Sequence, residues 1–281
     1  MLKLRVITAS VLFPFTLYCI LFLSNVSFAF VMGFVMLIAA YEWAGLAGFT
    51  TPLRKMAFVV IVGTVIYSVW LMNFAISSYF MNLLASIFWF FCAVLVLKYP
   101  KSASFWKDKS IVIAVMGIIL FLLTWYALIS IHGIEGLQFA QKTIEGPYIM
   151  LFCMMLIWAA DTGAYFSGIR FGKNKLAVQI SPGKSWEGVY GGTILAVLIA
   201  SAGTIFYQGS LQDYFNIITI TIATVAFSVV GDLLESMFKR QAGVKDSGKI
   251  LPGHGGMLDR IDGVIAAVPI FFIAISQLYK F

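Results

Sequence analysis

The sequence predicts an all-α polytopic membrane protein with about nine transmembrane helices, its N-terminus in the cytoplasm and its C-terminus outside. The first observation is composition: 61% of the 281 residues are hydrophobic and only 11% are charged, against roughly 25% in soluble domains. So little charge cannot cover the surface of a water-soluble enzyme of this size. The high hydrophobicity equally excludes a disordered chain.

The second observation is a series of nine apolar segments, each close to the roughly 20 residues that cross a bilayer as a helix. In chain order they are 5–24, 27–46, 56–74, 78–97, 110–131, 147–169, 187–208, 214–238 and 261–280. The first could pass for a signal peptide. Its long apolar run and the lack of a clear A-x-A cleavage site favour a retained helix.

The third observation is the distribution of basic residues, which predicts the orientation. With the N-terminus in the cytoplasm, all but two of the 19 lysines and arginines fall in inside segments; the exceptions are Lys142 and Lys280. Basic segments stay on the cytoplasmic side of a membrane. This asymmetry supports both the orientation and an odd number of spans.

Acidic residues distinguish the two halves of the chain. Only four of the 12 acids lie in the first 145 residues, and most of the others fall in or beside the last two large inside loops. We therefore predict a single integrated membrane domain with two parts. Residues 1–145 would form an N-terminal scaffold, and residues 146–281 a C-terminal catalytic region.

One helix near the C-terminus carries polar side chains on a single face. They are spaced i, i+3, i+4 and i+7: Asp232, Glu235, Ser236 and Lys239. An acid inside a span costs about 3 kcal/mol and usually faces a cavity, a partner or an ion. A functional role is therefore favoured for Asp232. For Glu235 and Lys239, a simple intrahelical ion pair is an equally good interpretation.

A glycine-rich stretch, residues 245–262, joins this helix to the last one. Its glycines let the backbone approach an anion closely, and the N–H groups ahead of a helix can cradle a phosphate. Asp259 and Asp262 follow on one face of the next helix's first turn. Acids at a helix start also favour the macrodipole, which would explain one of these residues. It would not explain the acids on the preceding helix.

These two elements together predict a magnesium site that handles polyphosphate. Oxygen-only ligands suit Mg²⁺ rather than zinc, and Mg²⁺ beside basic side chains is how proteins neutralise phosphate groups. The presence of a second cation stays open. The neighbouring basic residues are Lys239, Arg240, Lys245 and Arg260. His254 also lies in this stretch, where a structural role is the favoured interpretation.

A third element lies between residues 158 and 192. Asp161 is another acid within a predicted span, and Lys184 is favoured as a phosphate contact. The run 183–185 resembles part of a P-loop, but Val178 stands where that motif needs glycine, and we expect no strand ahead of it. The alternative interpretation is a helix start capped by Ser185.

For two further polar residues we expect no role in catalysis or binding. Glu42 lies beside Trp43 and is expected to be an interfacial anchor. His132 falls at the predicted outside face and is expected to be solvated.

The motifs resemble one known family. Residues 236–262 read S-x-F-K-R-x4-K-D-x-G-x2-L-P-x-H-G-G-M-x-D-R-I-D. This is similar, without departure, to the signature of the phosphatidate cytidylyltransferases, also called CDP-diglyceride synthetases. The runs 161–165, 172–173, 181–182 and 191–192 also resemble the bacterial members. Length and multi-span character agree over the whole chain.

The resemblance implies transfer of the cytidylyl group from CTP to phosphatidate, giving CDP-diacylglycerol and pyrophosphate in the presence of Mg²⁺. It implies a homodimer in the bacterial cytoplasmic membrane. The polar residues of the inside loops, together with a cytosolic nucleotide and a membrane lipid as substrates, place the expected active site at the cytoplasmic face, and we expect no nucleic-acid partner. The resemblance also implies a metal centre on Asp232 and Asp259, and substrate binding by Ser236, Lys239 and Arg240.

The residue patterns and the resemblance together give the full set of expected site residues. Asp232, Asp259 and Lys239 are the expected catalytic residues, and Asp262 joins the two aspartates as a metal ligand. Further substrate contacts are expected from Lys184, Asp161, Lys245, Asp246, His254 and Arg260.

Two alternatives remain at this stage. A cation-coupled transporter would use intramembrane acids, but it would need polar groups near both faces. Another lipid phosphotransferase would also fit a membrane site of acids and bases. The CDP-alcohol phosphatidyltransferases, however, carry D-G-x2-A-R…D-x3-D, whereas Asp259 and Asp262 are spaced D-x2-D.

Overall fold

The computed structural model describes residues 2–72, 77–107, 109–253 and 255–279. Within these ranges the chain is mainly helical, with two short antiparallel hairpins. The elements are α1 (Leu2–Phe22), α2 (Asn25–Leu46), α3 (Pro52–Leu71), α4 (Ser78–Leu97), η1 (Lys101–Phe105), α5 (Ser110–His132), β1 (Leu137–Phe139), β2 (Lys142–Ile144), α6 (Gly146–Phe171), β3 (Lys175–Ala177), β4 (Ser181–Ser185), α7 (Trp186–Phe206), α8 (Leu211–Gln241), α9 (Leu258–Ile261) and α10 (Val264–Leu278).

The predicted class, an all-α polytopic membrane protein, is confirmed. Among the described residues, eight helices are long and apolar enough to cross a membrane: α2 to α8, and the last helix over Leu258–Leu278. The first predicted segment forms α1, whose apolar part Ser10–Phe22 is shorter than the others. A ninth crossing by α1 therefore stays a prediction.

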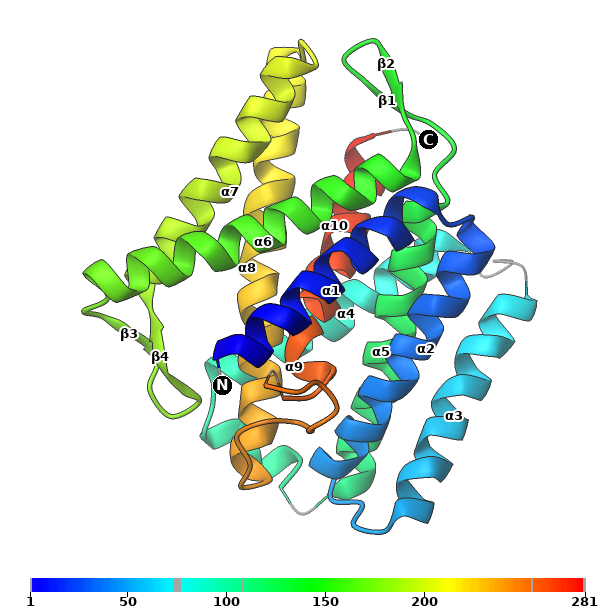
Figure 1. Ribbon diagram of the computed structural model, residues 1–281, viewed down its shortest axis with the longest axis vertical. Helices are drawn as coiled ribbons and strands as arrows, with labels where there is room; N and C mark the ends of the chain where they lie inside the picture. Colours follow the sequence, from blue (N-terminus) through cyan, green and yellow to red (C-terminus); the bar gives the residue numbers. More distant parts are fainter. Residues whose placement is uncertain (1, 73–76, 108, 254, 280–281) are drawn as a thin grey trace.

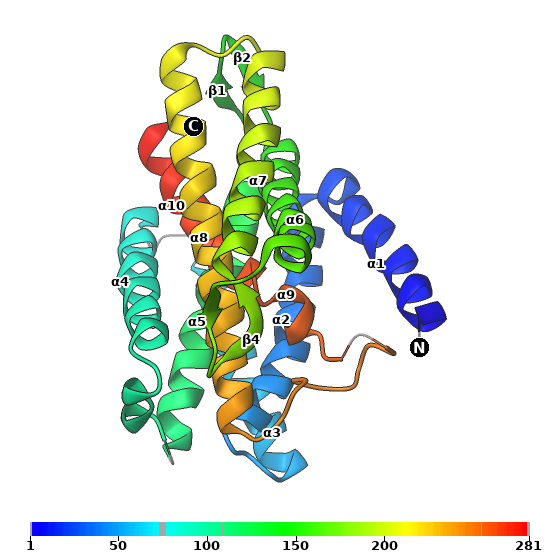
Figure 2. The ribbon, with the colours of Figure 1, turned by 90° about the vertical axis from the view of Figure 1, so that its left-hand side faces the viewer.

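The two ends of the bundle differ in what they carry. Figure 1 shows the β1–β2 hairpin and the C-terminus at one end of the long axis, with the orange loop before α9 in the other half. Figure 2 shows α1 leaning away from the bundle, with the N-terminus on the side of that loop. The placement of the two termini on opposite membrane faces stays a prediction.

Close packing between α6 and α7 depends on glycine. A Cβ added at Gly192 would overlap the carbonyl oxygen of Ala160, and one added at Gly163 would lie 2.6 Å from that of Gly191. Small residues let transmembrane helices approach closely where no hydrophobic effect drives them together. This approach sets the distance between Asp161 on α6 and the residues that precede α7.

The last transmembrane helix is broken just after its first turn. α9 ends at Ile261 and α10 begins at Val264; α10 packs against α8, and α9 packs against α2. Gly231 on α8 lies against this break, because a Cβ there would overlap the carbonyl oxygen of Asp262. The break therefore holds Asp262 beside the part of α8 that carries Asp232.

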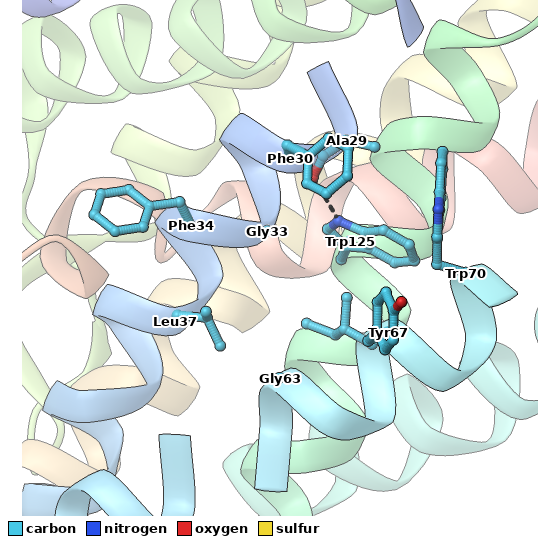
Figure 3. Close-up of a pocket in the computed structure, with 10 residues that line it drawn as sticks. Ala29, Phe30, Gly33, Phe34, Leu37, Gly63, Tyr67, Trp70 and Trp125 are labelled. Carbon is cyan, nitrogen blue, oxygen red and sulfur yellow. Dashed lines mark hydrogen bonds between the residues drawn. The ribbon is translucent and has the colours of Figure 1, made fainter. Parts of the chain in front are cut away.

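An apolar cavity of about 290 Å³ lies in the N-terminal half, between α2, α3 and α5. Figure 3 shows the rings of Phe30, Tyr67, Trp70 and Trp125 around it, with no charged side chain among the residues drawn. The indole N–H of Trp125 donates to the carbonyl oxygen of Ala29 at 3.0 Å. The cavity is built by aromatic packing, and none of the described residues that line it is acidic or basic.

The expected solvation of His132 is wrong. The side chain is 5% exposed, its ring stacks on Phe28 at 4.1 Å between centroids, and Nε2 lies 3.0 Å from the carbonyl oxygen of Ile20. The reason is the tight connection between α1 and α2, which brings the end of α1 over the last turn of α5. The sequence places His132 at the boundary of a predicted loop, and that position alone does not show that α1 covers its side chain.

Candidate functional site

A charged cleft of about 440 Å³ lies between α6, α7, α8 and the last helix. The residues that line it come from α6, β4, α7, α8 and residues 259–263. The charged residues that line it are Asp161, Lys184, Asp232, Asp259, Arg260 and Asp262. All six belong to the set predicted from the sequence.

The polar face of α8 forms as its spacing predicts. The hydroxyl of Ser236 donates to Oδ1 of Asp232 at 3.3 Å, and the ammonium of Lys239 lies 2.7 Å from Oε2 of Glu235. The helix runs to Gln241, three residues past the predicted end. Asp232 therefore lies about 13 Å from the end of the helix, at about 1.5 Å per residue.

Lys239 is the central cation of this face. Its ammonium lies 2.7 Å from Glu235 and also 2.7 Å from Oδ1 of Asp259, so it bridges two carboxylates. Lys239 and Glu235 are buried, and Glu235 is 0% exposed. The intrahelical pair thus exists, but it is part of a larger unit that ties α8 to α9. A buried charge of this kind is stable only with such partners.

Asp259 is bonded on both of its oxygens. The N–H of Ser247 donates to Oδ2 at 2.9 Å and the N–H of Gly256 donates to the same oxygen at 2.7 Å, while Lys239 contacts Oδ1. These donors come from the glycine-rich loop and from α8. Asp259 therefore organises the loop around Lys239 in this structure.

Lys184 and Asp232 face each other across the cleft and form an ion pair. Lys184 lies on β4 and Asp232 on α8, and both are partly exposed to the cleft. The expectation of no strand ahead of Lys184 is wrong, because β3 precedes it and pairs with β4. This hairpin is still no P-loop. It ends at Ser185, whose hydroxyl caps α7 by accepting from the N–H of Gly188 at 3.2 Å.

Some predicted residues lie outside the cleft. The guanidinium of Arg240 donates to the carbonyl oxygens of Ile180 at 3.1 Å and Val244 at 3.4 Å, which ties α8 to the β3–β4 connection. Lys245 and Asp246 are exposed on the loop. His254 falls outside the described residues.

The donor chemistry of the cleft fits a divalent cation. Among the described residues, no compact group of three or more His, Cys, Asp or Glu side chains forms a ready-made metal cage. The cleft nevertheless gathers the carboxylates of Asp161, Asp232 and Asp262, and the ammonium of Lys184 already supplies one positive charge against Asp232. All-oxygen donors with room for water and phosphate suit Mg²⁺.

Sequence reasoning missed Glu42. This residue lies near the end of α2, is 4% exposed, and accepts hydrogen bonds from the glycine-rich loop, so the expected interfacial anchor is wrong. The partners are more than 200 residues away in the chain. One signal was available: Glu42 is the only acid among the first 107 residues.

Comparison with known proteins gives near full-length matches. The profile described as the cytidylyltransferase family matches residues 3–278. A phosphatidate cytidylyltransferase of Haemophilus influenzae is 39% identical over 288 residues, covering 96% of this chain and 97% of the relative. One of Pseudomonas aeruginosa is 40% identical over 271 residues, covering 96% of each. One of Staphylococcus saprophyticus is 35% identical over 201 residues, covering 66% of this chain and 77% of the relative.

Proposed function

This chain belongs to the cytidylyltransferase family, and on that premise we propose that it transfers the cytidylyl group of CTP to phosphatidate. The products are CDP-diacylglycerol and pyrophosphate, as needed for phospholipid synthesis. The observation that carries the proposal is the similarity to two relatives named for this activity, which extends over 96% of the chain and so includes every residue of the charged cleft.

The reaction is a displacement at phosphorus. An oxygen of the phosphatidate phosphate attacks the α-phosphorus of CTP, and the bond from that phosphorus to the oxygen of the leaving pyrophosphate breaks. A phosphate monoester has a second pKa of about 6, so the attacking group is already largely ionised at neutral pH. The site therefore needs charge neutralisation more than a strong general base.

The cations of the cleft are placed for that neutralisation. Lys184 and Arg260 line the cleft from β4 and α9. Lys239 is not among the described residues that line it: its ammonium is buried between Glu235 and Asp259, and of these Asp259 lines the cleft. We assign Lys184 and Arg260 to the incoming phosphate groups. Lys239 is assigned to the charge that grows on pyrophosphate as it leaves.

Mg²⁺ is the cofactor that the donor set supports. We propose that Asp232 and Asp262 hold it, with Asp161 across the cleft and with Asp259 lining the same site while it holds Lys239. When bound, the ion lowers the negative charge on the CTP phosphates and on the departing pyrophosphate.

The membrane setting follows from the two substrates. CTP is water-soluble and phosphatidate is a membrane lipid, so the cleft belongs at a membrane–water interface. We propose a bacterial inner membrane, with the cleft facing the cytoplasm. The concentration of lysine and arginine in the segments predicted to lie inside supports that orientation. A homodimer remains part of the proposal.

A transporter is less well supported. A second large cavity, about 620 Å³, lies between α6, α7, α8 and α10 toward the end that carries the β1–β2 hairpin. No aspartate, glutamate, lysine or arginine is among the described residues that line it. A transporter would need a polar path for its substrate or ion to continue through this region, and these residues do not supply one.

The test is an assay of purified protein in detergent micelles with phosphatidate, Mg²⁺ and each of the four nucleoside triphosphates. We expect pyrophosphate release with CTP only when phosphatidate is present. Replacement of phosphatidate by diacylglycerol is the matched lipid control. Equal release without phosphatidate, or no release with any nucleotide, would refute the proposal.

A further inference from the structure

Glu42 is a buried acid from the N-terminal half that reaches into the C-terminal site. It lies one turn before the end of α2, where its neighbours are apolar, and its side chain is 4% exposed. A carboxylate in such a place needs hydrogen-bond donors, because desolvation of an unpaired charge is costly. Its donors all come from residues 247–258.

The carboxylate accepts three hydrogen bonds from this segment. The N–H of Met257 donates to Oε1 at 3.1 Å and that of Leu258 donates to Oε2 at 2.8 Å. The hydroxyl of Ser247 donates to Oε2 at 3.2 Å. Met257 and Leu258 lie where the glycine-rich loop ends and α9 begins, so the carboxylate of Glu42 ties this end of the loop to α2.

Two glycines make room for this carboxylate. A Cβ added at Gly248 would overlap Oε1 of Glu42, and one added at Gly256 would lie 2.5 Å from Oε2. The same loop donates the N–H groups of Ser247 and Gly256 to Asp259. Four N–H groups that the sequence suggested for a phosphate are thus bonded to carboxylates of the chain itself.

We propose that Glu42 is a positioning residue whose carboxylate, rather than a phosphate, accepts the hydrogen bonds of Ser247, Met257 and Leu258 in and beside the glycine-rich loop. It holds the loop in the one shape that keeps Asp259 on Lys239. The path is continuous: Glu42 bonds to Ser247, the N–H of Ser247 bonds to Asp259, and Asp259 contacts Lys239 at 2.7 Å. The inference rests on the proposed function, because the loop serves the cleft in which that reaction would occur.

The alternative role for the loop predicts the opposite kinetics. If these N–H groups were the binding site for CTP phosphates, Glu42 would compete with the nucleotide. Its removal would then lower the apparent KM for CTP. If Glu42 instead holds the loop, its removal leaves KM nearly unchanged and lowers kcat, because Asp259 and Lys239 lose their fixed position.

The first experiment compares Glu42→Gln and Glu42→Asp with Glu145→Gln, the same change at an exposed residue at the other end of the bundle. We expect Glu42→Gln to lower kcat by about 30-fold with less than a threefold change in KM for CTP. Such a loss is within the range found when a precisely placed charged group is misaligned. Glu42→Asp keeps the charge and should recover at least fivefold of that loss. Glu145→Gln should match the wild type.

A readout independent of activity is limited proteolysis with trypsin. The loop carries Lys245 and Lys249, both exposed. Release of the loop in Glu42→Gln should raise the rate of cleavage there by about tenfold, since proteolysis follows the population of the open form. Unchanged cleavage together with an unchanged kcat would overturn the inference, and so would a lowered KM.

A second variant keeps the test decisive if Glu42→Gln does not fold. Gly248→Ala leaves Glu42 intact but puts a methyl group against its carboxylate. We expect the same fall in kcat, whereas Gly203→Ala on α7, whose added methyl meets only Phe152 at 3.9 Å, should behave as the wild type. A wild-type rate in Gly248→Ala would overturn the inference. An inactive wild-type protein would refute the proposed function instead.

Discussion

Two cavities in the same helical bundle differ in what lines them. The one between α2, α3 and α5 is bounded by aromatic and aliphatic side chains, with one ring N–H already bonded to a carbonyl oxygen. The cleft between α6, α7, α8 and the last helix holds four aspartates and two cations. Charges within a membrane protein are retained at a cost and mark function. The difference therefore locates the chemistry, although both cavities arise from ordinary helix packing.

The N-terminal half of the chain contributes to both regions. Its residues line the apolar cavity, and the carboxylate of Glu42 accepts hydrogen bonds from the loop beside the charged cleft. The division at residue 145 stays a prediction about function. In the structure, the loop that precedes α9 is held from both parts.

The largest effect is expected at the charged cleft itself. Asp232→Asn keeps the side-chain volume but removes a charge that faces Lys184 and the proposed Mg²⁺. We expect turnover to fall by about 100- to 1,000-fold, with a monodisperse protein by size-exclusion chromatography. Asp259→Asn should behave alike. Pyrophosphate release near the wild-type rate in Asp232→Asn would contradict the assigned metal site; in Asp259→Asn it would contradict the role of Asp259 in holding Lys239 beside that site.

The next effect concerns Lys239. Lys239→Gln should lower kcat for pyrophosphate release by about 100-fold, and should raise KM for CTP by less, because the ammonium offsets charge that grows during the reaction. Glu235→Gln tests the competing explanation, a purely structural ion pair. If that explanation holds, Glu235→Gln lowers kcat as much as Lys239→Gln, and the double variant is no worse than either.

A smaller effect is expected where the helices around the cleft pack. Gly192→Ala would place a methyl group on the carbonyl oxygen of Ala160 and push α7 from α6. Overpacking of this kind costs about 1–3 kcal/mol. We expect thermal unfolding several degrees below that of Gly203→Ala, the control on the same helix, together with a partial loss of turnover. Equal unfolding temperatures would show that the close approach is dispensable.

The smallest effect is expected in the apolar cavity. Trp125→Phe removes the hydrogen bond to Ala29 and leaves most of the ring volume. The expected cost is about 1 kcal/mol of stability, with turnover within twofold of the wild type. A tenfold loss of turnover would break the comparison, because it would place function in the cavity assigned to structure.

Local spacing made part of the site predictable. Asp232, Ser236 and Lys239 share a face because an α-helix repeats every 3.6 residues, and apolar length revealed the transmembrane helices. The contacts of Lys239 with Asp259 and of Glu42 with Leu258 join distant segments, so no periodicity in the sequence could predict them. The glycines predicted a loop that cradles a phosphate, which stays a prediction; in the structure the N–H groups of this loop bind the carboxylates of Glu42, from α2, and of Asp259. The prediction that His132 is solvated was wrong because the end of α1, a different helix, covers its side chain.

The most direct test of the central claim follows which phosphorus of CTP enters the lipid. Purified protein is incubated with phosphatidate, Mg²⁺ and CTP labelled either at the α- or at the γ-phosphorus, and the chloroform-soluble label is counted. Cytidylyl transfer predicts lipid label from the α position and none from the γ position, and Asp232→Asn should abolish it. Lipid label from the γ position would identify a phosphotransferase of another kind. No lipid label from either position would contradict the assignment of the cleft to this reaction.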